Sequence, residues 1–153
     1  MSRRLLLAAW IGLLLTPASA ISQSVCGNAG RYHLRPAPTV LVAPLPTPAD
    51  LDAGEIDAGV MTVTIIPRGN TSKNWELCLR TTSPSMGGGT KPSADLEFWP
   101  PGGAEWQPAS TLEQVVARGR GRSDVELRFR VRVDWTDDPG SYSSVVALTV
   151  AAH

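Results

Sequence analysis

The chain has 153 residues and a formal net charge of zero, with 14 basic residues balanced by 14 acidic ones. This balance gives no compositional support for nucleic-acid binding, and the length fits one domain of ordinary size. Only 2 histidines and 2 cysteines are present, which makes a dedicated metal site or a histidine-dependent enzyme hard to build. We therefore expect no nucleic-acid partner, no metal and no cofactor.

Residues 1–20 have the pattern of a secretory signal peptide. Two arginines precede an apolar run over residues 5–15, and a stretch of small residues ends at Ala20. The apolar run is too short to cross a bilayer as a helix, which takes about 20 residues. We expect cleavage after Ala20, export to the periplasm or the extracellular space, and no transmembrane segment in the mature chain.

Both cysteines, Cys26 and Cys78, lie after the expected cleavage point. An even pair of cysteines in an oxidising compartment is expected to form one disulfide. A catalytic thiol would need a neighbouring base, but His33 lies in a proline-rich stretch and His153 is the last residue.

Residues 21–57 are expected to form an irregular, proline-rich N-terminal arm. Prolines on both sides of the β-branched run 39–43 predict an edge strand or an extended segment, because proline cannot donate to a ladder. Residues 50–57 are expected to form a turn and the entry to a strand. The sandwich domain itself is expected to cover residues 58–153.

Turn residues divide the remainder of the chain into short segments with strand patterns, and no convincing helix is found. The clearest segment is 124–135, in which apolar and charged residues alternate, as is typical of a strand with one buried and one solvated face. About seven strands are expected. One is the run 39–43 of the arm and another is the segment 124–135. The others lie at residues 60–66, 75–81, 94–99, 112–117 and 142–151. The set predicts an all-β fold, an antiparallel β-sandwich, with a small Greek-key barrel as the alternative.

Four short motifs occur in this part of the chain: Trp-Glu-Leu-Cys-Leu at 75–79, Phe-Trp at 98–99, the alternating strand that ends in Asp-Trp at 134–135, and Asp-Pro-Gly-Ser-Tyr at 138–142, before a Val/Thr-rich strand. Together they resemble small secreted bacterial immunoglobulin-like domains, within the broader class of pilin-like and spore-coat-U-like exported β-sandwiches. The resemblance covers about residues 58–151. It implies an immunoglobulin-like sandwich that acts in the envelope or outside the cell.

The cysteine positions depart from the immunoglobulin pattern, in which the disulfide joins inward-facing cysteines of two sheets. Cys78 alternates with Trp75, Leu77 and Leu79, so it should face away from the core if those residues face inward. We therefore expect a Cys26–Cys78 disulfide that fastens the N-terminal arm across the outside of a sheet.

Trp99 and Trp106 flank a Pro-Pro-Gly-Gly turn and form the first part of a candidate ligand surface. Two exposed indoles could stack on a sugar ring, although cross-strand pairing of aromatic side chains in a hairpin is their commoner use.

Arginines provide the second part of the candidate ligand surface. Arg128, Arg130 and Arg132 lie on the solvated side of the 124–135 segment and could bind an anionic group. Acidic residues are interleaved with them and dilute their charge, which favours an ordinary solvated strand face. The arginine-rich stretch begins further upstream, with Arg118, Arg120 and Arg122.

These observations favour a non-catalytic exported β-sandwich, a structural or binding module with an unknown envelope or extracellular partner. One alternative is a small secreted hydrolase or enzyme inhibitor, although the sequence has no G-x-S-x-G nucleophile motif. Another is a carbohydrate-binding module that uses Trp99 and Trp106. We expect a monomer, because residues 21–25 are too few to donate a strand to a second copy.

Overall fold

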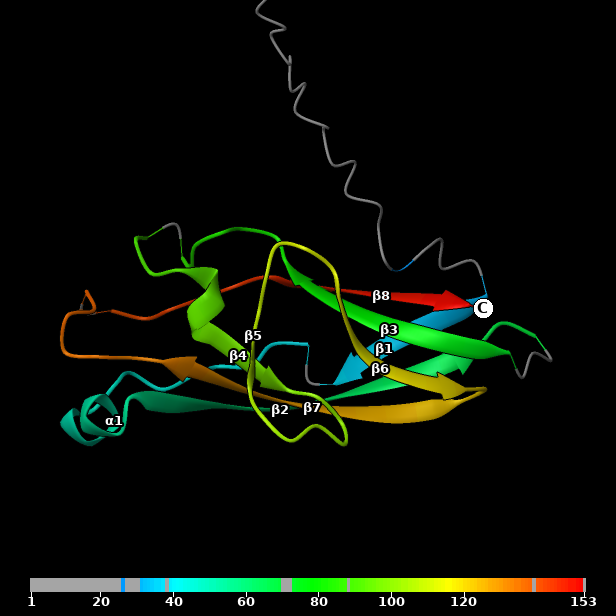
Figure 1. Ribbon diagram of the computed structural model, residues 1–153, viewed down its shortest axis with the longest axis horizontal. Helices are drawn as coiled ribbons and strands as arrows, with labels where there is room; N and C mark the ends of the chain where they lie inside the picture. Colours follow the sequence, from blue (N-terminus) through cyan, green and yellow to red (C-terminus); the bar gives the residue numbers. More distant parts are fainter. Residues whose placement is uncertain are drawn as a thin grey trace, which may run out of the picture.

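The computed structural model describes residue 26 and residues 31–37, 39–69, 73–87, 89–138 and 140–152. The predicted signal peptide, residues 1–20, and residues 21–25 lie outside this described part. Within it, two antiparallel sheets pack face to face as a β-sandwich, with the strands running along the long axis of the molecule (Figure 1). The predicted all-β sandwich is confirmed. The strands divide between two separate sheets, so the alternative of a single small barrel is not adopted.

The larger sheet has five strands and the smaller has three. In order across the larger sheet they are β1 (Tyr32–Ala37), β2 (Glu55–Pro67), β7 (Ser123–Arg132), β4 (Leu96–Trp99) and β5 (Gln107–Pro108). The smaller sheet consists of β6 (Gln114–Arg120), β3 (Asn74–Thr81) and β8 (Val146–Ala152). A short helix, α1 (Pro48–Ala53), and a single 3₁₀ turn, Ser93–Asp95, complete the described structure.

The core lies between the sheets and is filled by every second residue of the long strands. The predicted alternation holds over β7, because its apolar side chains are buried and its charged ones face outward. The strand ends at Arg132, however, so the prediction is wrong for Trp135, which is 63% exposed. A fully buried side chain of valine, leucine, isoleucine or phenylalanine stabilises the fold by about 1.5–3 kcal/mol. The fully buried core positions on the two sheets include Val63, Ile65, Leu77, Leu79, Phe98 and Leu127.

A β-bulge in β2 sets which of its residues reach this core. Ile56 before the bulge and Ala58 within it are buried, whereas the buried residues after the bulge start at Met61. The register against β7 shifts between Asp57 and Gly59, where Gly59 has a φ of +98° and its N–H donates to the Asp57 carboxylate at 2.8 Å. The extra residue moves the apolar face of β2 by one position, so that both halves of the strand face inward.

The N-terminal arm is more regular than the sequence predicts. Residues 32–37 were expected to be irregular, but they form β1, which pairs with β2 from Tyr32 opposite Pro67 to Ala37 opposite Thr62. Tyr32 is buried, and its hydroxyl donates to the Lys73 carbonyl at 2.6 Å. A proline is tolerated in β1 because the strand lies at the edge of its sheet.

The run 39–43 does not form the predicted edge strand: residue 39 lies at a bend, and residues 40–43 have no regular secondary structure. Leu41 packs against the core, whereas Val40 and Val42 are exposed.

Residues 48–53 form α1 instead of the predicted turn. Thr47 caps the helix and shares a capping box with Asp50, and the left-handed Gly54 ends it. Strand β2 then begins at Glu55, so it crosses the boundary expected between residues 57 and 58.

Trp75 on β3 lies opposite Gly119 on β6. The indole of Trp75 is buried, and its N–H donates to the Gly121 carbonyl at 2.9 Å. A Cβ atom added at Gly119 would lie 2.3 Å from the Trp75 ring. Only glycine therefore leaves room for this ring against β6.

We predict that Gly119→Ala lowers the free energy of unfolding by about 1–3 kcal/mol, because the Trp75 ring must move out of its packed position. Urea unfolding followed by tryptophan fluorescence measures the change. Gly89→Ala is the control, since the nearest atom to its added Cβ is 3.5 Å away. Equal losses in the two variants would contradict this explanation of Gly119.

Candidate functional site

The outer face of the five-stranded sheet carries all five residues predicted as a ligand surface. On β7, Arg128 lies opposite Trp99 and Arg130 lies opposite Glu97, while Arg132 follows two positions later on the same face. Trp106 comes from the segment before β5, and its ring centroid lies 4.4 Å from the Arg130 guanidinium carbon. The structure therefore brings these residues together, and their binding role stays a prediction.

Arg130 contacts three neighbouring side chains within this surface. Its Nε donates to the Glu97 carboxylate at 2.6 Å, its terminal nitrogen pairs with Glu55, and its flat group stacks on Trp106. The side chain is only 21% exposed. Arg130 thus links β2, β7, β4 and the segment before β5, which favours a structural role for it over a ligand-binding one.

Trp99 and Trp106 do not form a flat aromatic platform. Their ring centroids are 5.4 Å apart, but the ring planes cross at 80° in an edge-to-face contact. Both residues are half-buried, and Arg130 stacks on the Trp106 ring. This geometry is that of aromatic packing within a sheet.

Arg128 and Arg132 are the exposed cations of the surface, and neither has a charged or hydrogen-bonding partner among the described residues. The acidic side chains of Asp124 and Glu126 alternate with them along β7. The field over this face is therefore of mixed sign, as the sequence predicts.

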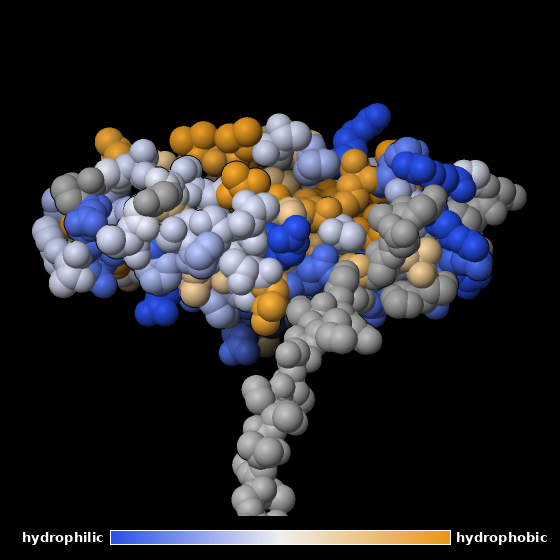
Figure 2. Space-filling view, turned by 90° about the horizontal axis from the view of Figure 1, so that it is seen from above, coloured by the Kyte–Doolittle hydropathy of each residue, from blue (hydrophilic) through white to orange (hydrophobic). Residues whose placement is uncertain are grey.

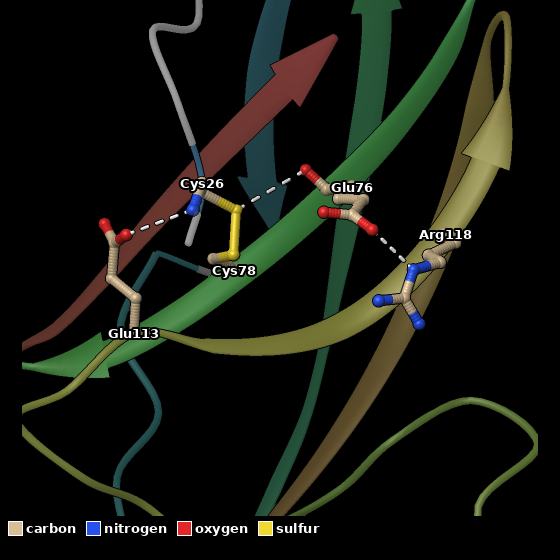
Figure 3. Close-up of a disulfide and its surroundings, with 5 residues drawn as sticks. All are labelled: Cys26, Glu76, Cys78, Glu113 and Arg118. Carbon is tan, nitrogen blue, oxygen red and sulfur yellow. Dashed lines mark hydrogen bonds and ion pairs between the residues drawn. A yellow bond between two sulfur atoms is a disulfide. The ribbon is translucent and has the colours of Figure 1, made fainter. Parts of the chain in front are cut away.

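Cys26 and Cys78 form the predicted disulfide on the outer side of the three-stranded sheet (Figure 3). Their Cα atoms are 6.0 Å apart, and both residues are buried. With Ala151 and Val115 they form a small apolar cluster that is separate from the main core. The outward orientation of Cys78 is thus confirmed.

Charged residues surround the disulfide cluster. The Cys26 backbone N–H donates to the Glu113 carboxylate at 3.3 Å, and Arg118 pairs with Glu76 at 2.6 Å (Figure 3). The contact with Glu113 places the backbone of residue 26 beside the start of β6, and the disulfide ties it to β3. This arrangement supports a fastening role for the disulfide.

A buried lysine network is a site that the sequence analysis missed. Lys91 is 6% exposed, and its Nζ donates to Asp137 at 2.7 Å and to Asp95 at 2.9 Å. The Tyr142 ring lies 5.2 Å from the same nitrogen. Lys91 therefore joins the segment between β3 and β4 to the segment between β7 and β8. The only indication of this network in the local sequence is that Asp95 follows Lys91 by four residues.

The charge of Lys91 depends on these partners. Burial of the ammonium lowers the pKa of Lys91, but the hydrogen bonds from Asp137 and Asp95 outweigh it and raise the pKa above the ordinary 10.5. The lysine is therefore charged throughout the neutral range, as an ion-pair partner must be.

The acidic runs of the sequence serve turns and caps. Asp50 caps α1, and hydrogen bonds from Thr47 lower its pKa; the same effect from Thr136 lowers the pKa of Asp134. Asp52 accepts the indole N–H of Trp135 at 3.1 Å.

Two kinds of feature are absent from the described part of the chain. It holds no group of three or more His, Cys, Asp or Glu side chains placed to bind a metal ion. It also holds no helix long and apolar enough to cross a membrane.

We predict that replacing both Cys26 and Cys78 by Ser leaves the sandwich folded, because the disulfide lies outside the main core. The loss in the free energy of unfolding should not exceed about 4 kcal/mol, the value expected for a disulfide that closes the loop from residue 26 to residue 78. Near-ultraviolet circular dichroism and urea unfolding test both statements. A double variant that is unfolded without denaturant would show that the disulfide is required for folding.

We predict that Lys91→Met lowers the free energy of unfolding by about 2 kcal/mol, since it leaves two partly buried carboxylates without their cation. The control, Arg118→Gln, removes an exposed ion pair and should cost less than about 1 kcal/mol.

The pH dependence gives a second test of the same variant. The folded state raises the pKa of Lys91, so its contribution is fully present below pH 10.5 and is lost as the pH rises through the folded pKa. The difference between wild type and Lys91→Met should therefore shrink in urea titrations above that pH. A difference that is constant up to pH 12 would contradict the ion-pair explanation.

No family model, no curated protein and no solved structure matches this chain.

Proposed function

We propose that this chain is a non-catalytic, exported β-sandwich that acts as a structural or binding module in the cell envelope or the extracellular space. The proposal combines a compartment, which the cysteines support, with a non-catalytic role, which the contacts of the polar side chains support.

The Cys26–Cys78 disulfide is the observation that carries the proposal. Disulfides form and persist in oxidising compartments, whereas cytosolic thiols are kept reduced. The bond joins residues that are 52 positions apart, and both cysteines are buried. This is the placement expected of a structural disulfide, and it agrees with the signal-peptide pattern of residues 1–20.

The ion pairs of Lys91 and Arg130 support a non-catalytic role. A general acid, base or nucleophile needs a positioned group that can still exchange a proton or attack a substrate. Lys91 and Arg130 instead each hold two carboxylates and contact an aromatic ring. These networks join separate segments of the chain, which suits a rigid module.

We expect the full-length chain, expressed in a bacterial host with an oxidising periplasm, to be recovered there as a protein that starts at residue 21. Its intact mass should correspond to residues 21–153 with one disulfide, and thiol titration under denaturing conditions should find no free cysteine. A version that lacks residues 1–20 is the control and should stay in the cytosol with both thiols reduced. Uncleaved cytosolic protein from the full-length gene would overturn the proposed compartment.

The non-catalytic part of the proposal has its own test. The exported protein is assayed on chromogenic ester, peptide and glycoside substrates, and no turnover above buffer is expected. Hydrolysis that co-purifies with the protein and is lost on unfolding would favour the secreted hydrolase instead.

A further inference from the structure

The charges of the folded chain are separated along its long axis, although the chain as a whole is neutral. One end of the sandwich, at the right in Figure 1, is formed by the start of β1, the β2–β3 and β6–β7 connections and the end of β8. Six basic residues lie at this end, which we call the basic end: Arg31, Arg68, Lys73, Arg118, Arg120 and Arg122. All six are exposed.

Strand register and backbone hydrogen bonds bring the basic end together. Arg120 lies opposite Asn74 at the junction of β6 and β3. The Arg68 N–H donates to the Arg31 carbonyl at 2.7 Å, and the Gly121 N–H donates to the Lys73 carbonyl at 3.3 Å. Connections from both sheets are therefore tied into one surface, and Figure 2 shows strongly hydrophilic side chains at this right-hand end.

Few acidic side chains offset this charge. Among the described residues, Asp124 and Glu76 are the acidic ones nearest the basic end, and Glu76 already pairs with Arg118. The opposite end of the sandwich is acidic instead, because α1, the start of β2 and the β7–β8 connection lie there. Its acidic residues are Asp50, Asp52, Glu55, Asp134, Asp137 and Asp138. Lys91 pairs with Asp137 and Arg130 pairs with Glu55, so these two cations offset part of the negative charge.

The separation is visible only in the folded chain. The β6–β7 turn divides the arginine-rich stretch, so that Arg120 and Arg122 reach the basic end while Arg128 and Arg132 lie on the mixed-charge face of β7. Residues far away in sequence, such as Arg31, are added to the first group by strand pairing.

We propose that the basic end docks on a lipid surface with anionic headgroups, with the long axis of the sandwich pointing away from it. Clustered Lys and Arg residues are attracted to an anionic bilayer by about 1 kcal/mol each near the surface. The acidic end is repelled by the same surface, so the two ends act together to orient the molecule. This inference does not rest on the proposed export, and its failure would leave that proposal intact.

The distribution of charge favours a plane over a chain-like polyanion. A linear polymer follows a stripe or groove of positive charge along a protein, whereas here the charge is gathered at one end of an elongated body. Sugar-ring stacking also lacks a partner at the described part of this end, because the rings of Tyr32 and Trp75 are buried.

Co-sedimentation of the purified, disulfide-bonded protein with lipid vesicles tests the proposal. We expect binding to phosphatidylcholine vesicles that contain roughly 30% of the anionic lipid phosphatidylglycerol. We expect no binding to vesicles of phosphatidylcholine alone. The variant Arg68→Gln/Arg122→Gln should weaken binding by about thirtyfold, from two residues at about 1 kcal/mol each. Raising the salt concentration should release the wild type, because the attraction is screened.

The matched control is Arg128→Gln/Arg132→Gln, which removes the same charge from the face of β7. Its binding should change by less than about threefold, since those residues lie outside the basic end. Equal weakening by the two variants would show that overall charge, and not the basic end, is responsible. Absence of binding to the anionic vesicles, or binding to heparin in its place, would overturn the assignment to a lipid surface.

Discussion

The register between β2 and β7 is the constraint on which the rest of the structure depends. Side chains alternate with a period of two, so a slip of one residue would move the apolar set of a strand to the solvent side. The β-bulge at Gly59 changes the phase of β2, so that Ile56 before it and Met61 after it both reach the core. The same pairing places Glu55 beside Arg130 and sets the outer face of the sheet.

The two outer faces carry different cross-links. On the five-stranded sheet, Arg130 joins two carboxylates and an indole, and so holds the short strand β4 and the segment before β5 against β7. On the three-stranded sheet, the Cys26–Cys78 disulfide fastens the chain that precedes β1. Lys91 has a similar role between two connections. The most buried polar groups therefore link separate segments of the chain, whereas like charges are clustered at the two ends of the sandwich.

Predictions from the sequence succeeded where the signal is local. The positions of β3 and β7 follow from alternation over consecutive residues, and the outward orientation of Cys78 follows from its phase relative to Leu77 and Leu79. The arginines of β7 were placed on one face for the same reason. β1 was missed because the prolines between residues 36 and 48 suggested an irregular chain. Only one of them lies in β1, and an edge strand accepts one. α1 was missed because Thr47 and Asp50, which cap it, are also common in turns.

The sequence by itself determined the all-β class, the pairing of its only two cysteines and the face on which Cys78 lies, because each depends on neighbouring residues or on a simple count. Only the tertiary structure decided which distant groups meet. Lys91 and Asp137 are 46 residues apart, and Arg130 and Glu55 are 75 apart. Such contacts depend on strand order and register, which are set by packing the whole core and have no local signal. The separation of charge between the two ends has the same origin.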